Sequence, residues 1–170
     1  MPMTLRLFLD TPVTRTELRG WLSRDHGFAL SGEEGTEADS LWLRSDRGSV
    51  IIGVPDPSEI NGPFEYEQPT TLEATLYPSK GPGAYEFLDY MAGDILQRCP
   101  GDAVLAHDTG PVILVRRGET VWVDPDPFTL EHLFAGTFRP AKLVHGLPPP
   151  ATPGPDPYAD DEEDAPAAAP

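Results

Sequence analysis

The composition of the chain changes sharply near Gly146, and this change limits how much of the sequence can fold. The segment 146–170 holds eight of the 21 prolines and six acidic residues, but no lysine or arginine. Only Leu147 and Tyr158 offer apolar side chains large enough to pack there. Such a segment cannot bury enough surface to offset the conformational entropy that ordering costs. We therefore predict a single domain over residues 1–145 and a disordered, proline-rich acidic tail over 146–170.

The charge of the chain restricts its partners. The sequence has 28 acidic and 12 basic residues, for a formal net charge of −16. Without the six acidic residues of the tail, 22 acidic residues face 12 basic ones, so the domain alone carries −10. Negative charge of this size repels phosphate groups. We therefore expect a protein partner, and neither nucleic acid nor an anionic membrane surface.

The sequence also favours a cytoplasmic location. Cys99 is the only cysteine, which excludes an internal disulfide and is compatible with a reducing compartment. No apolar run reaches the length of about 18 residues that a membrane helix needs. The first ten residues lack the basic start and apolar core of a secretory signal.

Apolar periodicity predicts the fold class. Helical spacing occurs over 84–98, and a Thr14/Glu17 capping box followed by Leu18, Trp21 and Leu22 predicts a helix over 14–24. Alternating or continuous apolar runs predict strands at 3–10, 40–44, 49–54, 70–77, 103–107, 111–116 and 120–123, and a short helix is expected at 127–134. This order indicates an α+β domain: a mainly antiparallel sheet of about six to seven strands with two main helices on one face. The other face would be open to a partner.

The histidine, cysteine and acidic residues of the sequence do not form a recognisable catalytic or metal-binding motif. None of the four histidines has metal-ligand spacing to another histidine or to Cys99. His107 and Asp108 are neighbours at a strand end, where adjacent side chains point to opposite faces. Asp124 and Asp126 fit a turn followed by a helix cap. We therefore predict no catalytic residue, no metal and no cofactor, and expect a binding protein rather than an enzyme.

Two features indicate a protein-binding surface. Trp42 lies between Leu41 and Leu43 on a predicted strand and faces away from both, although the pattern leaves open which side is buried. The connection before strand 70–77 is acidic and aromatic, which suits a basic partner, but an ordinary solvated loop is the alternative. The candidate partner-binding residues are Trp42, Asp56, Glu59, Glu65, Tyr66 and Glu67.

One stretch resembles a known family. Residues 85–99 (YEFLDYMAGDILQRC) lead into Pro100–Leu105 (PGDAVL) and then into an aliphatic strand that ends in Arg116 and Arg117. This helix–turn–hairpin is similar to the swarming-inhibition (Sit) type immunity proteins of bacterial polymorphic toxin systems. The resemblance implies a scaffold and a class of function, and it transfers no binding residue to this chain.

These observations lead to two hypotheses. The first is an immunity-type protein that neutralises a cognate, basic toxin by forming a complex with it. The alternative is an acidic adaptor or secretion-accessory protein that binds its partner through the tail. Deleting 146–170 would separate the two, because only the adaptor needs the tail for binding.

Overall fold

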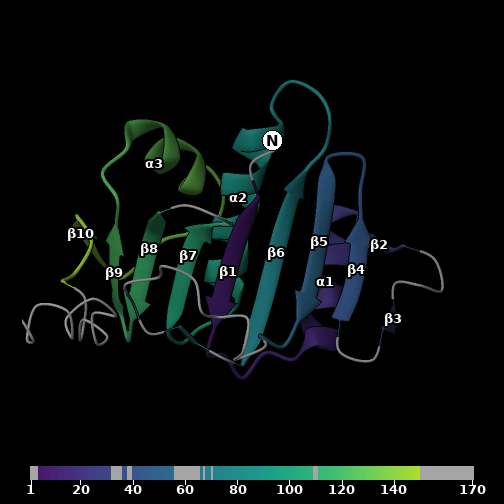
Figure 1. Ribbon diagram of the computed structural model, residues 1–170, viewed down its shortest axis with the longest axis horizontal. Helices are drawn as coiled ribbons and strands as arrows, with labels where there is room; N and C mark the ends of the chain where they lie inside the picture. The colour runs from purple at the N-terminus through teal and green to yellow at the C-terminus, as the bar shows by residue number, and fades with distance from the viewer. Residues whose placement is uncertain are drawn as a thin grey trace, which may run out of the picture.

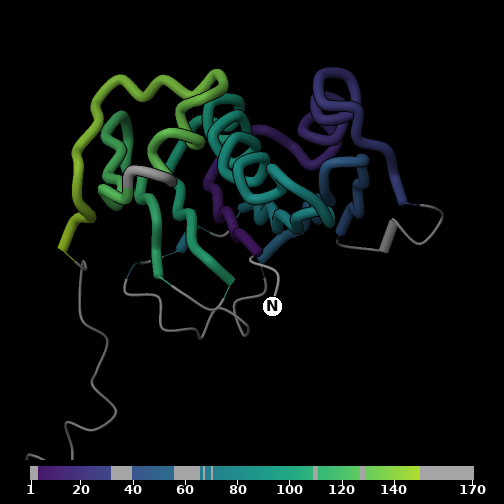
Figure 2. Tube along the Cα trace, turned by 90° about the horizontal axis from the view of Figure 1, so that it is seen from above, coloured from purple at the N-terminus to yellow at the C-terminus, as the bar shows by residue number. Residues whose placement is uncertain are grey.

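A broad sheet covered on one face by helices forms the structure, which is a computed structural model (Figures 1 and 2). It describes residues 4–31, 36–37, 40–55, 66, 68–69, 71–108 and 111–149. The α+β class and the mainly antiparallel pairing expected from the sequence are confirmed. None of the helices in these described segments is long and apolar enough to cross a membrane.

The sheet contains more strands than the seven expected. Seven strands match the predicted segments: β1 (Leu5–Leu9), β4 (Ser40–Arg44), β5 (Gly48–Gly53), β6 (Leu72–Pro78), β7 (Ala103–His107), β8 (Val112–Arg117) and β9 (Thr120–Val123). Three short ones are added: β2 (Ala29–Leu30), β3 (Thr36–Glu37) and β10 (Lys142–His145). The predicted count of about six to seven strands is therefore roughly right and differs by these short strands. Segments of two to four residues at a sheet edge are too short to show a period of two.

The described part of the chain contains three helices, and their ends follow local sequence signals. They are α1 (Arg15–His26), α2 (Ala84–Arg98) and α3 (Pro127–Leu133). The Thr14 side chain accepts from the Glu17 amide and the Glu17 side chain from the Thr14 amide, so the predicted capping box is confirmed. Gly27 then ends α1 in the left-handed conformation that glycine adopts easily.

The first strand lies in the middle of the sheet. The strand order is β10-β9-β8-β7-β1-β6-β5-β4-β2, with β3 beside β4. All pairs are antiparallel except β10 with β9. The chain therefore builds one half of the sheet, β4 to β6, after α1, and the other half, β7 to β9, after α2.

The main core fills the space between the sheet and the helices. Leu5, Leu7 and Leu9 of β1 point into it, together with Leu18 and Leu22 of α1 and the apolar stripe of α2. Figure 2 shows the helices gathered on this side of the sheet. The opposite face is called the open face below.

Half of the open face is covered, which corrects the expectation that all of it would be available. Phe8, Val104, Ala106, Val112 and Val115 form a second buried cluster there, over β1, β7 and β8. The cluster also includes Tyr66, and Leu147 packs against it. Among the residues that the structure describes, the half of this face formed by β4, β5 and β6 carries no such cluster.

The start of the predicted tail is packed on the domain. The Gly146 amide donates to the Val123 carbonyl at 2.7 Å, and the Tyr66 hydroxyl donates to the Pro148 carbonyl at 2.6 Å. Contacts therefore continue to Pro148, beyond the predicted domain boundary at residue 145. The remainder of the predicted tail, 150–170, lies outside the described residues.

Candidate partner-binding surface

Large apolar side chains gather on the uncovered half of the open face. Trp42 is 45% exposed, Val54 55% and Tyr77 38%. Only two other large apolar side chains in the described part of the chain, Tyr85 and Leu143, are as exposed, and both lie on other elements. Exposed aromatic residues that cluster on a rigid element are typical of protein-binding sites.

The strand register brings these side chains together. Trp42 on β4 is opposite Ile51 on β5, and Ile51 is opposite Thr75 on β6. Tyr77 lies two residues further along β6, on the same face as Thr75. Leu43, the inward neighbour of Trp42, is buried, so the structure decides the alternative that the sequence left open: Trp42 is the exposed residue.

The side chains enclose a shallow groove. Its volume is about 310 Å³, and its walls include Trp42, Ile51, Tyr77, Leu43 and Arg44. Most of this wall is carbon, so a partner's apolar side chain could be desolvated there. The Trp42 indole Nε1 donates to the Ser40 hydroxyl at 3.3 Å, which helps to hold the ring in place.

A charged hollow adjoins the groove. Its volume is about 410 Å³, and it shares Ile51 and Tyr77 with the groove. Arg6 is one of the residues that line it. Its Nε donates to Glu73 Oε1 at 2.7 Å, and its Nη1 lies 3.9 Å from Asp108 Oδ1. The guanidinium also lies over the Phe8 ring, 5.0 Å from its centroid. These contacts hold charged groups in place beside the aromatic side chains.

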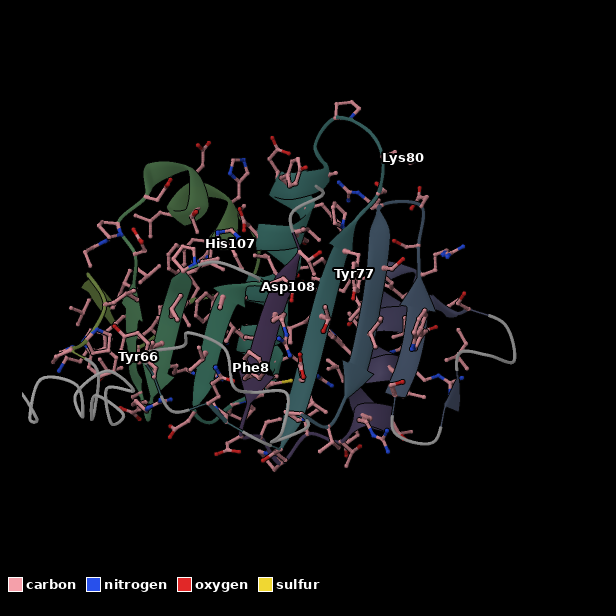
Figure 3. All side chains as sticks on the ribbon, viewed as in Figure 1. Phe8, Tyr66, Tyr77, Lys80, His107 and Asp108 are labelled. Carbon is pink, nitrogen blue, oxygen red and sulfur yellow. The ribbon has the colours of Figure 1, made fainter. Side chains whose placement is uncertain are left out.

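The surroundings of the Tyr77 hydroxyl favour its neutral form. Burial is the largest cause that raises the pKa of Tyr77 above its ordinary value, and the Asp108 carboxylate raises it further. Figure 3 shows Tyr77 and Asp108 in the same region, beside β6 and β1. The phenol is therefore protonated at neutral pH and can donate a hydrogen bond to a partner. We call Trp42, Ile51, Val54, Tyr77, Arg6, Glu73 and Asp108 together the open-face surface.

The candidate residues from the sequence separate into three groups. Trp42 belongs to the open-face surface. Tyr66 does not, because it is only 9% exposed and packs in the cluster over β1, β7 and β8, away from Tyr77 in Figure 3. The burial of this candidate could not be predicted from the sequence, because an aromatic residue in a loop gives no periodicity that indicates which side is buried. Asp56, Glu59, Glu65 and Glu67 lie outside the described residues.

Several members of the surface were missed by the sequence analysis. Arg6, Ile51, Glu73 and Tyr77 all occupy outward positions of predicted strands. Alternation could have identified those positions, but only the strand order places β1 beside β6 and β6 beside β5. That order depends on contacts between distant segments, which alternation does not encode.

A His–Asp pair on the helical side was also missed. His26 Nε2 lies 3.4 Å from Asp94 Oδ2, and Asp94 Oδ1 accepts from the amide and the hydroxyl of Thr137 at 2.8 and 2.7 Å. The buried carboxylate therefore connects the end of α1, α2 and the segment after α3. With both carboxylate oxygens occupied by neighbouring elements, the pair joins these elements together.

Comparison with protein-family models, with curated proteins and with solved structures finds no match for this chain.

Proposed function

We propose that this chain is an immunity-type protein that binds a cognate, basic toxin in the cytoplasm and neutralises it in a complex. The observation that carries the proposal is the open-face surface, where Trp42, Val54 and Tyr77 are exposed together beside fixed charged groups. Aromatic residues and arginine dominate the binding energy of protein interfaces. A sheet holds them rigidly, so little conformational entropy is lost on binding.

Charge supports a basic partner. The chain carries −16, which steers a positively charged protein toward it and repels acidic ones. The sequence between Val54 and Leu72 adds the acidic residues Asp56, Glu59, Glu65 and Glu67. Val54 lines the charged hollow, and the acidic connection follows Val54 directly in the sequence. The connection therefore begins at the open-face surface. The resemblance of 85–123 to Sit-type immunity proteins points to the same class of function.

The test is capture of the partner from the native host. The tagged chain is used at low and at high salt, and bound proteins are identified by mass spectrometry. We expect one basic protein that is toxic when expressed alone, and weaker capture at high salt because ions screen the attraction. An acidic partner, or capture that does not depend on salt, would contradict the electrostatic part of the proposal.

A matched pair of variants tests the surface itself. Trp42→Ala should weaken the affinity for the captured partner at least tenfold, as expected for a central aromatic contact. Tyr85→Ala is the control, because Tyr85 is a similarly exposed aromatic residue but belongs to α2. Equal losses in both variants, or no loss in Trp42→Ala, would exclude the open-face surface as the binding site.

A further inference from the structure

A small polar pocket lies at one end of the central strands, where β1 ends and β7 begins. Its volume is about 130 Å³, and it is lined by Asp10, Gln68, Pro69, Asp102 and Arg117. It shares no lining residue with the groove or the charged hollow of the open-face surface. The pocket is therefore separate from the surface on which the proposed function depends.

The side-chain amide of Gln68 is the group in this pocket that indicates a ligand. Gln68 is only 8% exposed, and neither its Nε2 nor its Oε1 has a hydrogen-bond partner among the described residues. Buried amide groups are nearly always paired, because removing them from water without compensation is unfavourable. A ligand that satisfies this amide must accept a hydrogen bond from Nε2 and also donate one to Oε1.

Two charged side chains of the pocket already have partners within the chain. Asp10 Oδ1 accepts from the Thr71 hydroxyl at 2.6 Å, and Arg117 Nη1 donates to the Arg116 carbonyl at 3.2 Å. Both residues have further interactions within the protein. They therefore form walls of the pocket, and binding at Gln68 does not require either of them to change its partners.

The same walls favour a neutral ligand over a charged one. An anion in the pocket would lie near the carboxylates of Asp10 and Asp102, and a cation would lie near the guanidinium of Arg117. In a confined site either repulsion is strong, because little water screens it. A neutral group that is both a donor and an acceptor avoids both repulsions and matches the two unpaired atoms of Gln68.

A primary amide has these groups in the required arrangement. Its carbonyl oxygen and the N–H on the same side form one edge, which can pair with the Gln68 amide through two antiparallel hydrogen bonds. Its second N–H then requires another acceptor in the pocket. The Asp102 carboxylate is held in place, because Oδ1 accepts from the Gly118 amide at 3.0 Å, and a carboxylate has capacity for further donors.

We propose that this pocket binds a primary amide, which pairs with Gln68 Nε2 and Oε1 and donates its second N–H to Asp102. A volume of about 130 Å³ suits a group of this small size. The amide can be carried by a free small molecule or by an asparagine or glutamine side chain of a protein. The chemistry of recognition is the same in both cases.

The side-chain amides of the protein give a direct signal for this binding. Gln68, Gln97 and Asn61 are the only glutamine and asparagine residues of the chain, so the ¹H–¹⁵N spectrum contains three side-chain NH₂ pairs. Titration of the full, ¹⁵N-labelled chain with acetamide should shift the Gln68 pair in a saturable manner. The Gln97 pair is an internal reference, because Gln97 Oε1 already accepts from the Arg139 amide at 2.9 Å.

Two comparison compounds test whether both hydrogen bonds of the Gln68 amide are used. N,N-dimethylacetamide has the carbonyl acceptor of acetamide but no N–H donor, and methylammonium has donors but no acceptor. Each can satisfy only one of the two Gln68 atoms. We therefore expect both to bind at least tenfold more weakly than acetamide at the same concentration and ionic strength.

Substitutions of Gln68 test the site itself. Gln68→Met keeps the length of the side chain but removes the amide, so it should weaken acetamide binding at least tenfold. Gln68→Glu keeps acceptor oxygens but has no N–H donor, and it should weaken binding by a similar factor. Gln97→Met is the matched control and should leave the affinity unchanged. In these variants the backbone amide shift of Asp102 is followed, and the rest of the spectrum reports whether the fold is kept.

A pair of blocked amino acids distinguishes the two sources of the amide. N-acetyl-glutamine methylamide carries a primary amide on a side chain, whereas N-acetyl-alanine methylamide has only backbone amides. Affinity for the glutamine compound equal to that for acetamide assigns the pocket to a side chain of a protein. Binding of acetamide without binding of the glutamine compound assigns it to a free small molecule.

Three results would overturn the proposal. The first is the absence of a saturable Gln68 shift with acetamide, which would mean that water alone fills the pocket. The second is equal affinity for N,N-dimethylacetamide, methylammonium or N-acetyl-alanine methylamide, which would show that the edge of a primary amide is not recognised. The third is undiminished affinity in the folded Gln68→Met variant, which would place the binding elsewhere on the protein.

Discussion

At the scale of single residues, Arg116 holds the end of α2 to the sheet. Its Nε donates to the Gly101 carbonyl at 2.5 Å, its Nη1 to the Leu96 carbonyl at 2.7 Å and its Nη2 to the Cys99 carbonyl. A helix leaves its last carbonyls without intrahelical partners, and a guanidinium supplies both donors and favourable charge there. Arg116 of β8 thereby joins the end of α2 and the turn that follows it to the sheet.

We predict that Arg116→Met destabilises the protein by about 2–4 kcal/mol, because it leaves three buried or half-buried carbonyls without their donor. Arg19→Met, on the exposed side of α1, is the control and should change the free energy of unfolding by about 0.5 kcal/mol or less. Urea unfolding followed by circular dichroism measures both. Equal stability of the two variants would mean that Arg116 does not cap α2.

Asp89 gives a prediction with a defined pH dependence. Burial, more than any other cause, raises the pKa of this α2 carboxyl from 3.8 to about 6. Because the folded protein favours the protonated form, this contribution to stability is complete below about pH 4 and is lost as the pH rises through 6. Asp89→Asn should therefore be more stable than the natural chain at pH 7.5, by about 1–3 kcal/mol.

The same variant contains its own control. At pH 4 the natural carboxyl is largely protonated in the folded protein, so the difference between the two proteins should largely vanish. The measurement is the free energy of unfolding from urea titrations between pH 4 and pH 8. A difference that is constant over this range would show that Asp89 does not titrate as its buried position requires.

At the scale of elements, close packing between α2 and α3 depends on one glycine. A Cβ atom at Gly93 of α2 would lie only 2.2 Å from the Leu133 carbonyl oxygen of α3. Gly93→Ala should therefore move α3 away and destabilise the protein by about 1–3 kcal/mol, despite the better helix propensity of alanine.

Gly20 of α1 is the matched control for this substitution. A Cβ atom at Gly20 would meet nothing within 4 Å, so Gly20→Ala should stabilise the protein by up to about 1 kcal/mol through helix propensity alone. Thermal unfolding of both variants distinguishes packing from propensity. A gain of stability in both would mean that α3 does not pack on α2 as closely as described.

Comparison of the predicted with the observed elements shows which of them local sequence signals are sufficient to predict. The helix over 84–98 was predicted with its observed bounds, because the apolar stripe, the glycine before it and the Pro–Gly after it all act within the segment itself. The parallel edge strand β10 was missed, because its side chains are mostly exposed and it pairs with β9 across the intervening α3. Likewise, Trp42 was identified by alternation, whereas its neighbours Tyr77 and Arg6 come from strands that only the tertiary fold brings together.

At the scale of the whole molecule, the contacts of residues 146–148 with the domain decide how the two functional hypotheses can be separated. A deletion that begins at Gly146 removes Leu147 and the Pro148 carbonyl, both of which contact the buried cluster around Tyr66. Such a deletion would change the domain as well as the tail. A deletion of 150–170 removes all six acidic residues of the segment and leaves these contacts intact.

We predict that deletion of 150–170 leaves the free energy of unfolding unchanged, whereas deletion of 146–170 lowers it by about 1–2 kcal/mol through the lost hydrogen bond and apolar packing. If the open-face surface binds the toxin, deletion of 150–170 should keep most of the affinity. The association rate constant should fall somewhat, because the deletion removes six negative charges that attract a basic partner. Association kinetics at low salt measure this loss, and high salt should remove the difference. Complete loss of binding after deletion of 150–170, with stability unchanged, would instead support the adaptor that acts through its tail.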